Sequence, residues 1–170
     1  MQFDNKKYDA AYHDKFRALT VKQPYADDLV TAAYMDDDGH VMAIKTIEVR
    51  SKNTQYRGDL LICSSKSPVL PGRESGVTLG FVELYDVKPV SEFTPEDWEN
   101  TRIPKDKRKE ITMGYGWLMR NPRRVVEYPV KGQLGIYNLV YTKGEIIEYP
   151  RKVVIDKKSW EQIKSQVHGK

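Results

Sequence analysis

Apolar and polar residues alternate along much of the chain, and this period of two predicts strands rather than long helices. The runs that show it lie at residues 16–21, 47–50, 60–64, 77–87, 125–130, 134–141 and 145–155. Turn signals separate several of them, such as Asp36-Asp37-Asp38-Gly39 and Lys143-Gly144, the second of which predicts a hairpin. Many short strands that do not alternate with helices predict an α+β domain, and we expect a small β-barrel with short flanking helices.

Three segments carry helix signals. Proline is favoured in a first helical turn, so Gln23-Pro24 is expected to open a helix that runs to about Tyr34. Residues 94–98 combine a threonine N-cap, a proline and two acids, which predicts a second, short helix. Asp156 is a good N-cap for a third helix, which we expect to dock within the domain through Trp160, Ile163 and Val167.

With 170 residues the chain is long enough for one hydrophobic core, so we expect one domain. Residues 1–15 are polar and lack periodicity, which predicts an N-terminal tail. The domain is expected at residues 16–142, and residues 143–170 are expected to form a C-terminal strand and helix extension that packs on it.

The single cysteine, Cys63, excludes an intramolecular disulfide, and its apolar neighbours predict a core residue rather than a nucleophile. No apolar run approaches the roughly 20 residues that span a bilayer, and the N-terminus lacks a signal-peptide core. We therefore expect a cytoplasmic protein without a membrane partner.

The net charge of +4 is modest, so the placement of the cations matters more than their number. Residues 102–109 hold five lysines and arginines, which could contact phosphates or form a solvated face. Residues 114–124 combine glycines, aromatics and arginines, a mixture that suits base stacking and phosphate contacts. Within them, Trp117 is expected to pack in the core.

The densest polar chemistry lies in residues 44–59, around a predicted strand. Side chains alternate across a strand, so Glu48 and Arg50 share one face. Lys45 is expected just before the strand, with its long side chain turned back toward them. Two interpretations follow: a surface ion pair worth under about 1 kcal/mol, or a functional cluster of Lys45, Glu48 and Arg50.

An ordered set of motifs places this cluster in a wider pattern. It comprises Leu19-Thr-Val-Lys-Gln-Pro-Tyr-Ala26, Lys45-Thr-Ile-Glu-Val-Arg-Ser51, Tyr56-Arg-Gly58, Leu79-Gly-Phe-Val-Glu-Leu-Tyr-Asp86, Trp117, Asn121-Pro-Arg123 and Pro129-Val-Lys-Gly132. Across roughly residues 16–141 the chain resembles the ASCH domain family, named for homology to the activating signal cointegrator 1. That family belongs to the PUA-like superfamily of small β-barrels associated with RNA and other nucleic acids.

The resemblance implies a cleft between the barrel and the first helix. Its ligand-binding residues would be Gln23, Tyr25, Lys45, Glu48, Arg50, Tyr56, Arg57 and Lys131. Lys45 and Arg57 would hold a phosphate or carbonyl oxygen, and Tyr25 or Tyr56 could stack on a base. Glu48 and Arg50 could equally brace the barrel. An insertion at residues 34–42 carries three aspartates, and acid near the cleft would discourage nucleic acid.

Two functions follow, and neither requires a cofactor or a metal. The first is a module that binds RNA or other nucleic acid. The alternative is a hydrolase acting on a modified nucleoside or RNA, because similar small proteins are N4-acetylcytidine amidohydrolases with a Lys-Thr-x-Thr-x-Arg motif. Lys45 matches that motif, but Glu48 occupies a threonine position and removes the presumed nucleophile. The remaining hydrolytic chemistry would use Glu48 as general base and Lys45 at the oxyanion.

Overall fold

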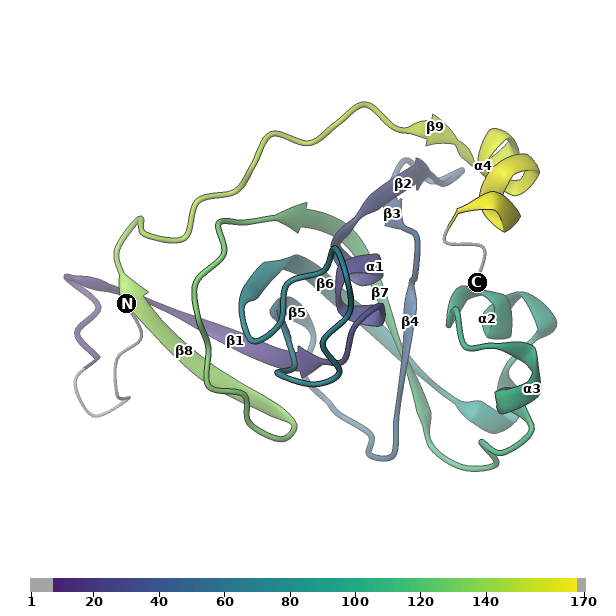
Figure 1. Cartoon of the computed structure of the whole chain (residues 1–170), viewed down its shortest axis with the longest axis horizontal. Coiled ribbons are helices and arrows are strands. Elements are labelled where there is room, and N and C mark those ends of the chain that lie inside the picture. Colours follow the sequence, from purple (N-terminus) through teal and green to yellow (C-terminus); the bar gives the residue numbers. More distant parts are fainter. Residues whose placement is uncertain (1–7, 168–170) are drawn as a thin grey trace.

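Six strands form one curled sheet in the computed structural model, which describes residues 8–167 (Figure 1). They are β1 (His13–Val21), β4 (Ile47–Arg50), β5 (Gly58–Ser64), β6 (Thr78–Pro89), β7 (Tyr115–Arg124) and β8 (Ile136–Thr142), in the spatial order β4-β7-β6-β5-β1-β8. Only the β1–β5 pair is parallel among these neighbours. The predicted α+β class is confirmed, and the sheet curls into a half-barrel.

The central strands are buried on both faces because successive side chains enter two different cores. Leu60 and Ile62 of β5 pack in one core, which is covered by α1 (Tyr25–Val30). Leu61 and Cys63 pack in the other, against aromatic and aliphatic residues of β8. The alternation that predicted these strands therefore distributes their side chains between two packed layers.

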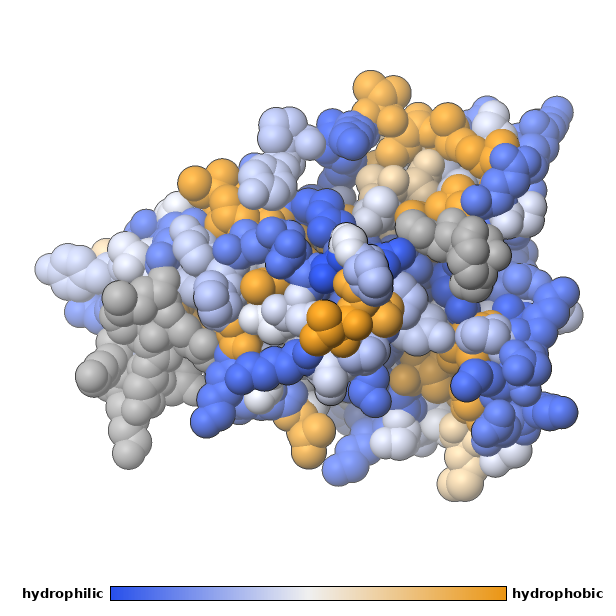
Figure 2. Space-filling view, viewed as in Figure 1, coloured by the Kyte–Doolittle hydropathy of each residue, from blue (hydrophilic) through white to orange (hydrophobic). Residues whose placement is uncertain are grey.

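The C-terminal helix α4 (Lys157–Ile163) packs on a smaller sheet of β2 (Ala32–Met35), β3 (Val41–Ala43) and β9 (Ile155–Asp156). Trp160 stacks on Tyr34 with ring centroids 5.7 Å apart, whereas Ile163 stays 41 % exposed. The predicted N-cap is confirmed, because the Asp156 carboxylate accepts from the Ser159 amide at 2.8 Å. Apolar side chains gather on the surface around β9 and α4 (Figure 2).

The division into tail, domain and extension stays a prediction, and residues 1–7 and 168–170 lie outside the described residues.

Two short helices, α2 (Pro95–Asn100) and α3 (Lys105–Arg108), and the 3₁₀ turns Val90–Glu92 and Lys164–Gln166 complete the described fold. The helix predicted at residues 94–98 is confirmed as α2, with Thr94 and Asp97 exchanging capping hydrogen bonds. Between residues 8 and 167, no helix has the length and apolarity needed to cross a membrane. The cytoplasmic location stays a prediction.

Three sequence predictions of elements were wrong. The first helix ends at Val30, not near Tyr34, because residues 32–35 pair with β3 across the acidic turn. Residues 125–130 were predicted to form a strand but make only isolated bridges. The strand in this part of the chain is β7, which ends before them, and bulges in its pairing with β6 accommodate its irregular residues. The predicted hairpin after the turn at Lys143-Gly144 does not form, because residues 145–154 are not a strand paired with β8. They continue from the end of β8 along the outside of the sheet to β9 (Figure 1).

Cys63 is fully buried, as predicted, and desolvation raises the pKa of its thiol to about 12. Only a thiolate attacks disulfide reagents, so the native protein is expected to resist 5,5′-dithiobis(2-nitrobenzoate) at pH 8. In concentrated urea the thiol regains a pKa of about 8.5 and should react fully. The absorbance of the released thionitrobenzoate measures both rates. Similar rates in the native and unfolded protein would show that Cys63 is accessible.

Candidate functional site

A cavity of about 450 Å³ lies between the end of β1, the start of α1 and the edge strand β4. Four residues selected from the sequence line it: Tyr25, Lys45, Glu48 and Arg50. The position of the cluster follows from the predicted geometry, because Lys45 precedes β4 and its side chain turns back to Glu48. Local sequence spacing was sufficient to predict this contact.

The Lys45 side chain is almost completely buried, with 1 % of its surface exposed. Its ammonium group donates to the carbonyl oxygens of Ile47 at 2.6 Å and Thr101 at 2.7 Å, and lies 3.3 Å from Glu48 Oε1. Burial lowers its pKa, and Glu48 opposes that shift. An ammonium group has three protons, so these three acceptors use its full donor capacity. The Tyr25 ring covers it, with its centroid 4.9 Å from Nζ.

Arg50 connects two strands that are far apart in the sheet order. Its Nε lies 3.1 Å from Glu48 Oε2, and its Nη2 donates to the Thr20 carbonyl on β1 at 2.8 Å. The curl of the sheet brings β4 to β1. Glu48 thus orients Arg50, and both residues brace the half-barrel while lining the cavity. The two roles considered from the sequence are geometrically compatible.

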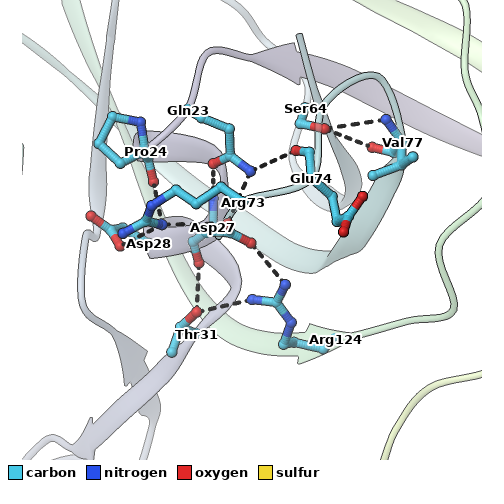
Figure 3. A network of polar contacts seen from close by, with 10 residues as sticks. All are labelled: Gln23, Pro24, Asp27, Asp28, Thr31, Ser64, Arg73, Glu74, Val77 and Arg124. Atoms are coloured by element: carbon cyan, nitrogen blue, oxygen red, sulfur yellow. Dashed lines mark hydrogen bonds and ion pairs between the residues drawn. The ribbon is translucent and has the colours of Figure 1, made fainter. Parts of the chain in front are cut away.

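The other selected residues lie outside this cavity lining. Gln23 is buried and belongs to the network drawn in Figure 3. Its side-chain Nε2 donates hydrogen bonds to the Asp27 carboxylate and to the Glu74 carbonyl oxygen. The Tyr56 hydroxyl donates to the Asp59 carbonyl. Arg57 donates to the carbonyls of Thr54 and Tyr56. The turn at residues 56–58 therefore does not line the cavity as the resemblance implied. A ligand-binding role for these residues stays a prediction.

Two further cavities share Leu134 with the first. One, of about 370 Å³, shares Gln133 and Leu134 with it and is also lined by Lys66 and Lys131. The other, of about 430 Å³, shares Arg50 and Leu134 and is also lined by Lys52. We call the three adjoining cavities the groove. Lys131 thus belongs to it, one cavity away from Lys45.

The charges that line the groove are strongly asymmetric. Six cationic residues line it: Lys22, Lys45, Arg50, Lys52, Lys66 and Lys131. Glu48 is its one lining carboxylate among the described residues. Three of these cations, Lys22, Lys52 and Lys66, were not predicted as site residues from the sequence. Lys22 stands beside the Gln23-Pro24 motif and Lys52 lies within residues 44–59, so both had a usable signal, whereas nothing local distinguishes Lys66 from an ordinary surface lysine.

The basic stretch at residues 114–124 does not extend the groove. Arg120 pairs with Glu83 at 2.9 Å, Arg123 with Asp59 at 2.7 Å and Arg124 with Asp27 at 2.8 Å. These arginines are engaged by acids of the same fold. Trp117 is 4 % exposed and packs in the core, as predicted.

Residues 102–109 lie on the other side of Tyr25. Arg102, Lys105 and Arg108 line a further cavity of about 750 Å³, which adjoins the first through Tyr25 and Ile103 and is also lined by Asp28 and Glu99. Arg108 and Lys105 approach Glu99 at 3.5 and 4.0 Å. The stretch therefore mixes solvated and paired cations beside the groove.

The acidic insertion forms the β2–β3 hairpin, and none of its aspartates lines the groove. The acids of the insertion lie away from the groove, because the hairpin pairs with β9 and packs on Trp160. At its tip, ligand-capable atoms of Asp36, Asp38 and His40 lie within 4.8 Å of one another. Asp36 Oδ1 already accepts from the Asp38 and His40 amides, an arrangement that shapes the turn itself.

Comparison with known protein families gives a match to the model described as the ASCH domain, over residues 40–130. No curated protein matches the chain. The matched region contains Lys45, Glu48 and Arg50 and runs from the acidic hairpin to the end of the segment after β7. Lys22, Tyr25 and Leu134 lie outside it, so part of the groove is built from residues beyond the matched region.

Proposed function

This chain belongs to the ASCH domain family, and on that premise we propose that it is a binding module for nucleic acid, RNA in particular, with the groove as its site. The observation that carries the proposal is the excess of six lining cations over one lining carboxylate. Nucleic-acid backbones carry one negative charge per phosphate, and lysine and arginine contacts to them supply most of the sequence-independent affinity.

The exposed lysines support this proposal more directly than the buried cluster does. Lys22, Lys66 and Lys131 are exposed, and no ion pair joins any of them to a carboxylate within residues 8–167. Their ammonium groups are therefore available to phosphates. Lys45 and Arg50, in contrast, already satisfy backbone carbonyls and Glu48. They shape the floor of the groove and add positive potential there.

The contacts of Lys45 favour binding over the hydrolase alternative. Lys45 would have to release a carbonyl or Glu48 before it could steady an oxyanion, because its three protons already have acceptors. Both Glu48 oxygens already contact cations, Oε1 with Lys45 and Oε2 with Arg50, so the carboxylate is engaged within the fold. Thr46 is buried and does not line the cavity, so it supplies no hydroxyl nucleophile there.

Binding of a fluorescein-labelled oligouridylate of about 10 nucleotides, followed by anisotropy, tests the proposal. Affinity should fall with rising salt, with a log–log slope of about −0.7 for each phosphate contact. The triple variant K22A/K66A/K131A should bind about tenfold or more weakly at low salt, and its slope should be shallower by about 2.

The matched control is K143A/K152A/K158A, which removes the same charge at exposed positions away from the groove lining. An equal loss of affinity in both triple variants would show that binding depends only on net charge, and it would overturn the assignment of the groove. Absence of binding by the natural protein would overturn the proposal altogether. Release of acetate from N4-acetylcytidine, or cleavage of a mixed RNA pool, would favour the hydrolase instead.

A further inference from the structure

Leu134 is 99 % exposed, although leucine is among the residues most often buried. It lies in the turn before β8, between Gln133 and Gly135. A single exposed leucine is common on protein surfaces and needs no explanation by itself. The position of this one relative to the groove sets it apart.

Leu134 is the residue at which the three cavities of the groove meet. It lines the first cavity with Lys22, the second with Lys66 and Lys131, and the third with Lys52. Among the described residues it is the only one that lines all three. An apolar side chain in water thus stands at the centre of a surface whose charged residues are almost all cationic.

This combination matches the two needs of binding an unpaired polynucleotide. Lysines bind the phosphates, and apolar or aromatic side chains must cover the faces of bases that have no stacked neighbour. In a duplex the base faces are already stacked, so an apolar wedge can reach them only at the cost of unstacking. A free nucleoside would use one cavity and leave the cations of the other two without a partner.

We infer that the groove binds an unpaired segment of RNA and that Leu134 packs against its bases, separating one base from the next. The inference rests on the proposed function and specifies its substrate class. Lys66 and Lys131 on one side and Lys52 on the other would contact the flanking phosphates. Base contact through an aliphatic side chain carries little sequence preference, because every base presents a flat apolar face.

Replacement of Leu134 tests this inference without endangering the fold, since the side chain loses almost no surface on folding. Leu134→Ser should leave the thermal midpoint unchanged and weaken binding of the labelled oligouridylate roughly tenfold. The slope of log affinity against log salt concentration should equal that of the natural protein, because no phosphate contact is lost. Leu134→Met should retain the affinity, because methionine preserves the apolar contact.

An oligonucleotide of the same length with abasic spacers in place of the bases isolates the base contact. The natural protein and Leu134→Ser should bind it equally, because only phosphates and sugars remain. Val153→Ser is the matched control, since Val153 is 101 % exposed and lines none of the three cavities. It should bind both oligonucleotides like the natural protein.

The outcomes separate this inference from the proposed function. Salt-dependent binding that the three groove lysines control, but that Leu134→Ser does not change, would overturn the role of Leu134 alone. If Leu134→Ser loses as much affinity for the abasic oligonucleotide as for the oligouridylate, Leu134 does not contact the bases. Binding of the duplex form as tightly as the single strand would overturn the preference for an unpaired segment. If the natural protein binds none of these molecules, both proposals fall together.

Discussion

Replacing Lys45 with methionine is expected to destabilise the protein by about 3–5 kcal/mol, the usual cost of removing one partner from a buried charged pair. Methionine has a similar length, so the loss comes from polar groups rather than from a void. The Ile47 and Thr101 carbonyls would lose their ammonium donor, and Glu48 would lose a cation at 3.3 Å. Urea unfolding followed by tryptophan fluorescence measures the change.

Lys22→Met is the matched control, because Lys22 lines the same cavity but is exposed. Its effect on unfolding should stay within about 0.5 kcal/mol. The double variant K45M/E48L should recover part of the loss, because it no longer leaves a carboxylate beside an apolar side chain. If K45M is as stable as the natural protein, the ammonium group is not a brace, and a direct role in ligand binding regains weight.

Asp27→Ala is expected to cost about 2–4 kcal/mol, because Asp27 is the centre of the network in Figure 3. Its carboxylate accepts from Gln23 Nε2 at 2.9 Å and Arg124 Nη2 at 2.8 Å, and Arg73 Nη1 lies 3.3 Å away. The expected loss of stability is smaller than for Lys45 because the Arg124 side chain is 35 % exposed and solvent screens its charge. Urea unfolding again provides the measurement.

Asp27→Asn keeps an oxygen acceptor but removes the charge, so about half of the loss should remain. Asp37→Ala is a suitable control, since Asp37 is exposed in the β2–β3 turn. An equal, small effect of Asp27→Ala and Asp37→Ala would show that the network adds nothing to stability. The network also holds α1, which carries Tyr25 to the groove. If the groove binds RNA as proposed, loss of Asp27 should therefore weaken that binding before the whole domain unfolds.

The cluster of Lys45, Glu48 and Arg50 could be predicted because all its members lie within six residues of one another. Strand alternation fixes the common face of Glu48 and Arg50, and the length of the lysine side chain permits the return contact. Gln23 and Arg57 were placed at the cleft by resemblance alone. Their contacts with Asp27 and with the Thr54 carbonyl depend on neighbours that sequence spacing does not specify.

The error at β7 has a similar cause. Residues 115–124 contain a glycine and Pro122, which disfavour a strand, whereas residues 125–130 alternate as a strand should. The structure places β7 between β4 and β6, and two register shifts against β6 absorb the irregular residues. Strand preference depends on the partners available on both sides, and those partners are distant in sequence.

The residue pattern was enough to predict the α+β class, the capped helix at Thr94, the buried Cys63 and Trp117, and the contact of Lys45 with Glu48. Each of these rests on periodicity or on spacing over a few residues. The three-dimensional arrangement, in contrast, sets which cations share a groove and which are neutralised by acids. Lys22, Lys52, Lys66 and Lys131 come from four separate segments, and Leu134 joins them because the curled sheet brings those segments together.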